Sequence, residues 1–122
     1  MQYNPYQKYM QQSVSTMTPA QMLIALYDKA VTELKKAMIY IDEKNYAGAH
    51  KSITRVEDIV DMLDSNLKVK YEISNNLAAI YDYLRRSLVQ ANVKKDKELV
   101  ESLIPFFEEL RDAYKEISHS GY

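Results

Sequence analysis

The sequence contains no cysteine and no tryptophan, and its 122 residues include only two glycines and three prolines. Without cysteine the chain can form neither a disulfide scaffold nor a thiolate metal site, and it has no cysteine nucleophile. The glycines, Gly48 and Gly121, are the residues we expect at positive φ. Two glycines are too few for phosphate-cradling loops or a hairpin-rich β fold. The absences therefore leave a single small domain without a nucleotide loop.

The charges are balanced, because the sequence has 16 basic and 17 acidic side chains and its net charge is -1. Such a chain has no long-range field that would draw it onto nucleic acid or an anionic membrane. No apolar run approaches the roughly 20 residues of a membrane span, and the N-terminus lacks the basic-then-apolar layout of a signal peptide. We therefore expect no nucleic-acid partner, no membrane insertion and no export by the general pathway.

Helical periodicity is what the sequence has in abundance. Thr18, Pro19 and Gln21 form a strong helix start, with a capping threonine, a proline at the first helical position and a glutamine that completes a capping box. Apolar residues then recur three or four positions apart along four segments. These segments are 19–42, 46–66, 72–93 and a last helix that starts near a cap at Asp96. Pro105 should kink or break that last helix.

The domain organisation follows from this pattern and from the short connections between the segments. Short connections make consecutive helices antiparallel. The predicted fold class is all-α, an antiparallel up-down four-helix bundle over residues 18–118. Residues 1–17 are rich in Gln, Ser and Tyr and are expected to form an N-terminal arm, either mobile or docked in a groove. Residues 119–122 form a short tail.

Metal chemistry has little support in the histidines. A di-iron bundle needs paired Glu-x-x-His motifs that face inward. Glu116 and His119 supply one such spacing, but His50 has Ala47 three residues before it, so the second motif is missing. We therefore expect no metal and no cofactor.

A small helical enzyme of the chorismate mutase type is the alternative function, since such enzymes clamp a dicarboxylate with basic side chains. Four arginines are available for a clamp: Arg55, Arg85, Arg86 and Arg111. Three of them have a carboxylate at the spacing of exposed helix pairs: Asp82 with Arg86, Asp58 with Arg55 and Glu108 with Arg111. Solvated ion pairs are the more economical interpretation of this pattern.

Apolar surface and tyrosine are in surplus for a plain bundle. The first helix carries a second apolar row (Ile24, Tyr27, Val31 and Met38), and Tyr81 and Tyr83 flank the seam of the third. Tyrosine and methionine are favoured where a surface accepts another chain. Three of the eleven tyrosines lie in the first nine residues. The pattern predicts a binding surface for a partner segment, or a homodimer face, and an arm that docks on an apolar groove.

Several segments carry a family resemblance through their order and spacing. They are Tyr9 to Val14, Thr18-Pro19, Leu26-Tyr27-Asp28, Met62 to Leu67, Asn76-Leu77, Tyr81-Asp82-Tyr83, Arg85-Arg86, Leu88, Ala91-Asn92 and Leu110 to Tyr114. On these residues the chain resembles the FliS-type flagellin export chaperones, from about residue 4 to residue 116.

The resemblance implies a cytoplasmic, non-enzymatic helical bundle that binds the disordered C-terminal region of flagellin. It implies that binding prevents premature polymerisation and keeps flagellin ready for type III export, with contacts to the export gate. The protein is expected to be a monomer or a weak homodimer. Together with the apolar surplus, the resemblance predicts eleven flagellin-binding residues: Tyr6, Tyr9, Val14, Ile24, Tyr27, Val31, Leu63, Leu67, Tyr81, Tyr83 and Leu88.

Overall fold

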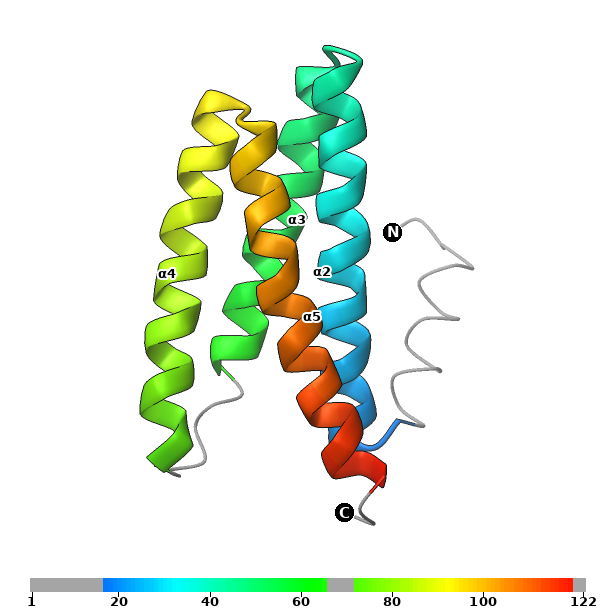
Figure 1. The fold of residues 1–122 in the computed structure, drawn as a ribbon, viewed down its shortest axis with the longest axis vertical. Coiled ribbons are helices and arrows are strands. Elements are labelled where there is room, and N and C mark those ends of the chain that lie inside the picture. Colours follow the sequence, from blue (N-terminus) through cyan, green and yellow to red (C-terminus); the bar gives the residue numbers. More distant parts are fainter. Residues whose placement is uncertain (1–16, 66–71, 120–122) are drawn as a thin grey trace, which may run out of the picture.

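The computed structural model describes residues 17–65 and 72–119, and within these residues it contains four α-helices and no strand (Figure 1). The predicted all-α bundle is confirmed. The helix boundaries agree with the predicted segments to within one residue for the first three helices. The helices are α2 (Pro19–Asp42), α3 (Tyr46–Ser65), α4 (Glu72–Lys94) and α5 (Lys97–His119).

The start of α2 has the predicted capping box. The Thr18 side chain accepts the Gln21 backbone N–H at 3.1 Å, and the Gln21 side chain accepts the Thr18 N–H at 3.0 Å. Two backbone donors that no helical carbonyl could reach are thereby satisfied. Asp96 plays a similar part for α5, because its carboxylate accepts the Leu99 N–H at 3.2 Å.

Lysines, not glycines, take the positive φ values in the two described turns. Lys44 has φ 58° and Lys95 has φ 50°, so the expectation that glycine would fill such positions is wrong. Each lysine follows a helix, and in each case the next amide closes the turn: Asn45 N–H donates to Tyr40 O at 2.8 Å and Asp96 N–H to Ala91 O at 3.1 Å. These bonds offset the steric cost of a left-handed lysine.

Gly48 lies inside α3 and is required for a different reason. A Cβ at this position would lie 2.9 Å from a ring carbon of Tyr40 on α2. Glycine therefore allows α2 and α3 to approach closely at this end of the bundle, where any side chain would force the Tyr40 ring to move.

The helices run alternately up and down, and α2 contacts α3 and α5 while α4 contacts the other flanks of α3 and α5 (Figure 1). The order around the bundle is thus α2, α3, α4, α5. Helix α2 packs most extensively, and α4 and α5 share the smallest contact of the four neighbouring pairs. The edge between α4 and α5 is consequently the least closed side of the bundle.

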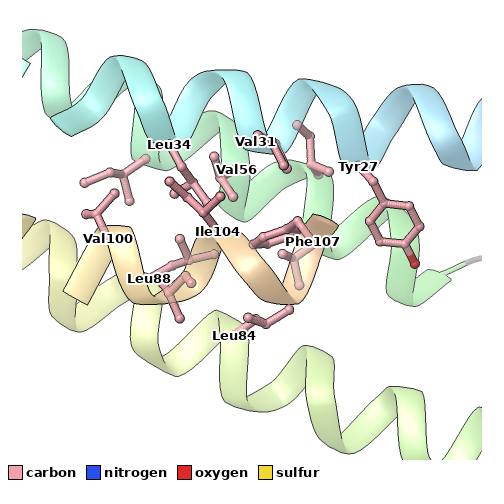
Figure 2. Packing of buried hydrophobic residues seen from close by; sticks show 14 of the residues in the cluster. Tyr27, Val31, Leu34, Val56, Leu84, Leu88, Val100, Ile104 and Phe107 are labelled. Atoms are coloured by element: carbon pink, nitrogen blue, oxygen red, sulfur yellow. The ribbon is translucent and has the colours of Figure 1, made fainter. Parts of the chain in front are cut away.

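The core is a layer of aliphatic side chains from all four helices, closed by aromatic rings (Figure 2). Pro105 does not break α5, which continues from Lys97 to His119, so the part of the prediction that expected a break is wrong. Pro105 is exposed, where water can satisfy the carbonyl that loses its helical partner. The largest fully buried apolar side chains are Tyr27, Leu34, Ile53, Leu63, Tyr81, Leu84, Leu88, Leu103 and Phe107.

Candidate binding surface

Tyr27 of α2 and Tyr81 of α4 meet inside the bundle, with their hydroxyl oxygens 2.5 Å apart. Both side chains are buried. The Tyr114 ring of α5 stacks on Tyr27 with a centroid distance of 5.7 Å and an interplanar angle of 23°. Burial raises the pKa of Tyr27 and raises the pKa of Tyr81 to about 12. The hydroxyls therefore stay neutral and connect α2 to α4 across the bundle.

Five of the seven predicted binding residues that the structure describes are buried. Tyr6, Tyr9, Val14 and Leu67 lie outside the described residues. Ile24 is partly buried, and Tyr83 is the one exposed member among those described, at 43%. The other five are core residues: Tyr27, Val31, Leu63, Tyr81 and Leu88.

For those five, the expectation of an exposed groove is wrong. A bundle helix faces two neighbours, so the second apolar row of α2 is covered by packing instead of being left open. Figure 2 shows Val31 of this row in the same buried cluster as Ile104 and Phe107 of α5. Whether any of the eleven residues contacts a partner stays a prediction.

One stretch of accessible apolar surface lies along the edge between α4 and α5, in addition to single exposed side chains elsewhere such as Ile39 and Tyr46. The Tyr83 ring contacts Phe106 with a centroid distance of 5.5 Å and an interplanar angle of 48°. Ile80 is one turn before Tyr83 and Leu110 one turn after Phe106, and both are partly buried. Because the two helices are antiparallel, these one-turn neighbours continue the same stripe. We call the stripe of Ile80, Tyr83, Phe106 and Leu110 the α4–α5 seam.

The seam leads toward the buried tyrosines. Tyr114 follows Leu110 by one turn of α5 and stacks on Tyr27. Phe106, Leu110 and Tyr114 are each partly exposed while packing against the core. Phe106 and Leu110 are not among the eleven predicted binding residues. Residues 99, 106, 110 and 114 nevertheless form an apolar row beside the core seam of α5, which is the same signal that the first helix carries.

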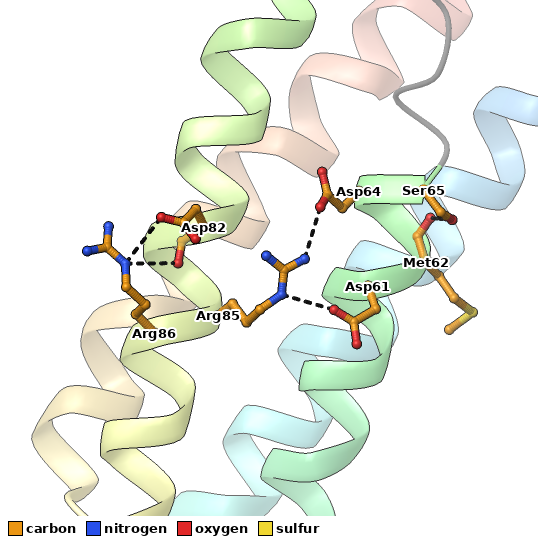
Figure 3. A network of polar contacts seen from close by, with 7 residues as sticks. All are labelled: Asp61, Met62, Asp64, Ser65, Asp82, Arg85 and Arg86. Carbon is orange, nitrogen blue, oxygen red and sulfur yellow. Dashed lines mark hydrogen bonds and ion pairs between the residues drawn. The ribbon is translucent and has the colours of Figure 1, made fainter.

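Arg85 holds α4 to α3 with a forked ion pair (Figure 3). Its Nε donates to Asp61 and its Nη2 to Asp64, each at 3.0 Å. Hydrogen bonding to Asp64 and then to Asp61 raises the pKa of Arg85. The predicted pair of Asp82 and Arg86 is confirmed at 3.3 Å on the outside of α4. Both guanidiniums are thus engaged by aspartates.

Arg55 and Arg111 form ion pairs that their sequence spacing did not predict. Arg55 pairs with Glu33 of α2 at 3.5 Å, not with Asp58. Arg111 pairs at 3.1 Å with Asp28 and with Asp112, and the predicted pair with Glu108 is not formed. Carboxylates on the neighbouring helix lie within reach of these long side chains, so cross-helix contacts replace the expected pairs within one helix.

Two further kinds of site are missing from residues 17–65 and 72–119. No three histidine, aspartate or glutamate side chains there come together in a way that could hold a metal ion. None of the four helices combines the length and the apolar character needed to cross a bilayer.

One known protein family matches nearly the whole chain. Residues 2–121 match the family described as "Flagellar protein FliS". The chain belongs to the FliS family. A relative from Bacillus subtilis (strain 168), named flagellar secretion chaperone FliS, is 31% identical over 117 residues that cover 96% of this chain and 88% of the relative.

Enterobacterial FliS proteins of the same name are also similar. The Salmonella typhimurium (strain LT2) protein is 26% identical over 112 residues, which cover 87% of this chain and 81% of that protein. The Escherichia coli (strain K12) protein is 27% identical over 110 residues, which cover 85% of this chain and 79% of that protein. These FliS proteins are named as chaperones and not as enzymes. We therefore treat the chain as a non-enzymatic protein, and the alternative of a mutase-type enzyme is set aside.

Proposed function

We propose that this FliS family member is a cytoplasmic flagellar secretion chaperone that binds the disordered C-terminal region of flagellin. Binding prevents premature polymerisation and keeps flagellin competent for type III export, after which the complex meets components of the export gate. The observation that carries the proposal is the α4–α5 seam. There the partly exposed rings of Tyr83 and Phe106 lie at the edge where neighbouring helices make the least contact.

The physical basis is burial of apolar surface on both partners. A disordered segment pays an ordering cost when it binds, and it offsets that cost by wrapping a large apolar area. The seam offers a row of aromatic and aliphatic side chains along two antiparallel helices. Such a row suits a client whose apolar side chains recur at helical spacing, or an extended client whose alternate side chains contact the seam.

The N-terminal arm has a regulatory part in this proposal. Tyr6, Tyr9 and Val14 would cover the apolar surface in the absence of client, and the client would replace or join them. In a protein that works as a monomer or weak homodimer, a cover of this kind prevents association of exposed apolar surface between copies.

Isothermal titration calorimetry with a peptide from a flagellin C-terminus tests the function. We expect saturable binding at micromolar concentrations. The absence of any binding heat at tens of micromolar peptide would contradict the proposal, because it would mean that the binding free energy is weaker than roughly -6 kcal/mol. Deletion of residues 1–15 tests the arm separately, because a client affinity that does not change would show that the arm neither covers nor completes the site.

A further inference from the structure

A buried carboxylate gathers basic side chains at the edge between α2 and α3. The Glu33 side chain is fully buried. Lys29 Nζ lies 3.0 Å and Lys36 Nζ 3.6 Å from its Oε1, and Arg55 Nη1 of α3 lies 3.5 Å from Oε2. Burial by itself raises the pKa of Glu33, but the nearby Lys29 and Ser52 side chains and the charge of Lys36 lower it overall. The group therefore stays ionised at neutral pH.

The balance of charge at this edge is positive. Three cations share one carboxylate, and their side chains remain about half exposed, at 49% for Lys29, 47% for Lys36 and 58% for Arg55. Lys51 is exposed one turn before Arg55 on α3 and forms no ion pair with any described residue. We call Lys29, Lys36, Lys51 and Arg55 the α2–α3 basic edge.

The geometry of the basic edge is regular. Lys29 and Lys36 are two turns apart on one side of α2, which places them about 10 Å apart along the helix axis. Lys51 and Arg55 are one turn apart on the facing side of α3. Because Glu33 holds three of the four side chains in place, part of their conformational entropy is already lost before a ligand binds.

The basic edge is on the opposite side of the bundle from the α4–α5 seam. The order of packing around the bundle is α2, α3, α4, α5, so the edges α2–α3 and α4–α5 share no helix. A segment bound along the seam would leave the basic edge accessible.

We infer that the α2–α3 basic edge docks an acidic helical segment of a second protein, separate from the client of the seam. Carboxylates that recur every three or four residues along one face of a helix would match cations one and two turns apart. Four charges over about 10 Å are few for a polyanion that binds through its phosphates. Charge complementarity therefore favours a short acidic protein segment.

Fluorescence anisotropy with a defined probe tests this inference on the full-length protein. The probe is a labelled 18-residue helical peptide with glutamate at successive i, i+4 positions and alanine or leucine between them, about five turns long. We expect saturable binding that weakens with salt, and a loss of about tenfold in affinity when Lys36→Gln and Lys51→Gln are combined. The control combines Lys35→Gln with Lys94→Gln, two exposed lysines away from the edge, and should change affinity by less than about twofold.

The two double variants carry the same net charge, so a difference between them cannot come from general attraction. Equal weakening in both, or no saturable binding to the wild type, would overturn the inference. Tighter binding of a single-stranded oligonucleotide than of the peptide would also overturn it.

A second variant tests the same edge through its buried ion pair. Combining Arg55→Gln with Glu33→Gln removes both partners together and avoids an unpaired buried charge. That variant should weaken peptide binding while circular dichroism shows an unchanged fold. The inference does not depend on the proposed client, because the probe binds in the absence of flagellin.

Discussion

Tyr81 and Tyr83 are two residues apart on α4, yet one side chain is 1% exposed and the other 43%. Tyr81 points into the bundle, where its hydroxyl meets that of Tyr27. Tyr83 lies on the flank toward α5 and contacts Phe106. Two residues correspond to about 200° around a helix, which is enough to place neighbours of the same type in opposite environments.

The difference separates two uses of tyrosine in this protein. The inner cluster of Tyr27, Tyr81 and Tyr114 joins three helices through a hydrogen bond and a stacked ring. The outer pair of Tyr83 and Phe106 leaves aromatic surface accessible. Changes to the inner cluster should therefore alter the stability of the fold, and changes to the outer pair should alter binding.

Replacement of Tyr81 by alanine should have the largest effect on stability. It removes a fully buried ring and leaves the Tyr27 hydroxyl without its partner, so the free energy of unfolding should fall by about 3–5 kcal/mol. Tyr83→Ala should cost about 1 kcal/mol or less. Urea denaturation followed by circular dichroism measures both. Similar losses in the two variants would show that the inner and outer tyrosines are not distinct.

Alkaline pH should weaken the inner cluster by a smaller amount. Burial raises the pKa of Tyr81 to about 12, from an ordinary value of 10.0. The folded state therefore holds this proton more tightly than the unfolded state. The contribution of the protonated Tyr81 hydroxyl to the free energy of unfolding is complete below pH 10. It is lost as the pH rises toward 12, at about 1.4 kcal/mol per pH unit.

Urea midpoints measured between pH 9 and pH 12 would record this loss, with tyrosinate absorbance as a second signal. The variant that combines Tyr27→Phe with Tyr81→Phe has no buried hydroxyls to ionise and should show a shallower decline. An identical pH dependence in the wild type and this variant would contradict the assignment.

The hydrogen bond itself should contribute least. Tyr81→Phe alone leaves the Tyr27 hydroxyl buried without its hydrogen-bond partner, which should cost about 1–2 kcal/mol. The double phenylalanine variant removes both polar groups at nearly constant volume and should be more stable than the single variant. A double-mutant cycle measures this coupling, and additive losses would argue against a direct hydroxyl contact.

Heptad spacing and capping residues predicted much of the fold. The apolar rows and the threonine cap sufficed for α2 because both signals are local. The turns were not predictable in the same way, since Lys44 and Lys95 adopt positive φ only because nearby backbone bonds close each turn. Likewise, Arg55 and Arg111 each pair with a carboxylate of α2, and local spacing carries no information about a neighbouring helix.

The candidate site was harder to predict than the fold. An apolar row beside a helix seam is the same in the sequence whether a neighbouring helix covers it or not. The row of α2 that includes Tyr27 and Val31 is buried in the bundle, whereas Tyr83 remains open because α4 and α5 pack least. The degree of contact between two helices depends on the whole bundle and is not encoded in either row alone.

Calorimetric titration of a flagellin C-terminal peptide into Tyr83→Ala tests the central claim most directly, namely that the outer aromatic pair binds client while the inner cluster supports the fold. The matched control is Tyr46→Ala, because Tyr46 is 50% exposed at the start of α3. We predict that Tyr83→Ala weakens binding about tenfold with little loss of stability, and that Tyr46→Ala changes affinity by less than about twofold. Unchanged affinity in Tyr83→Ala, or an equal loss in Tyr46→Ala, would contradict the account.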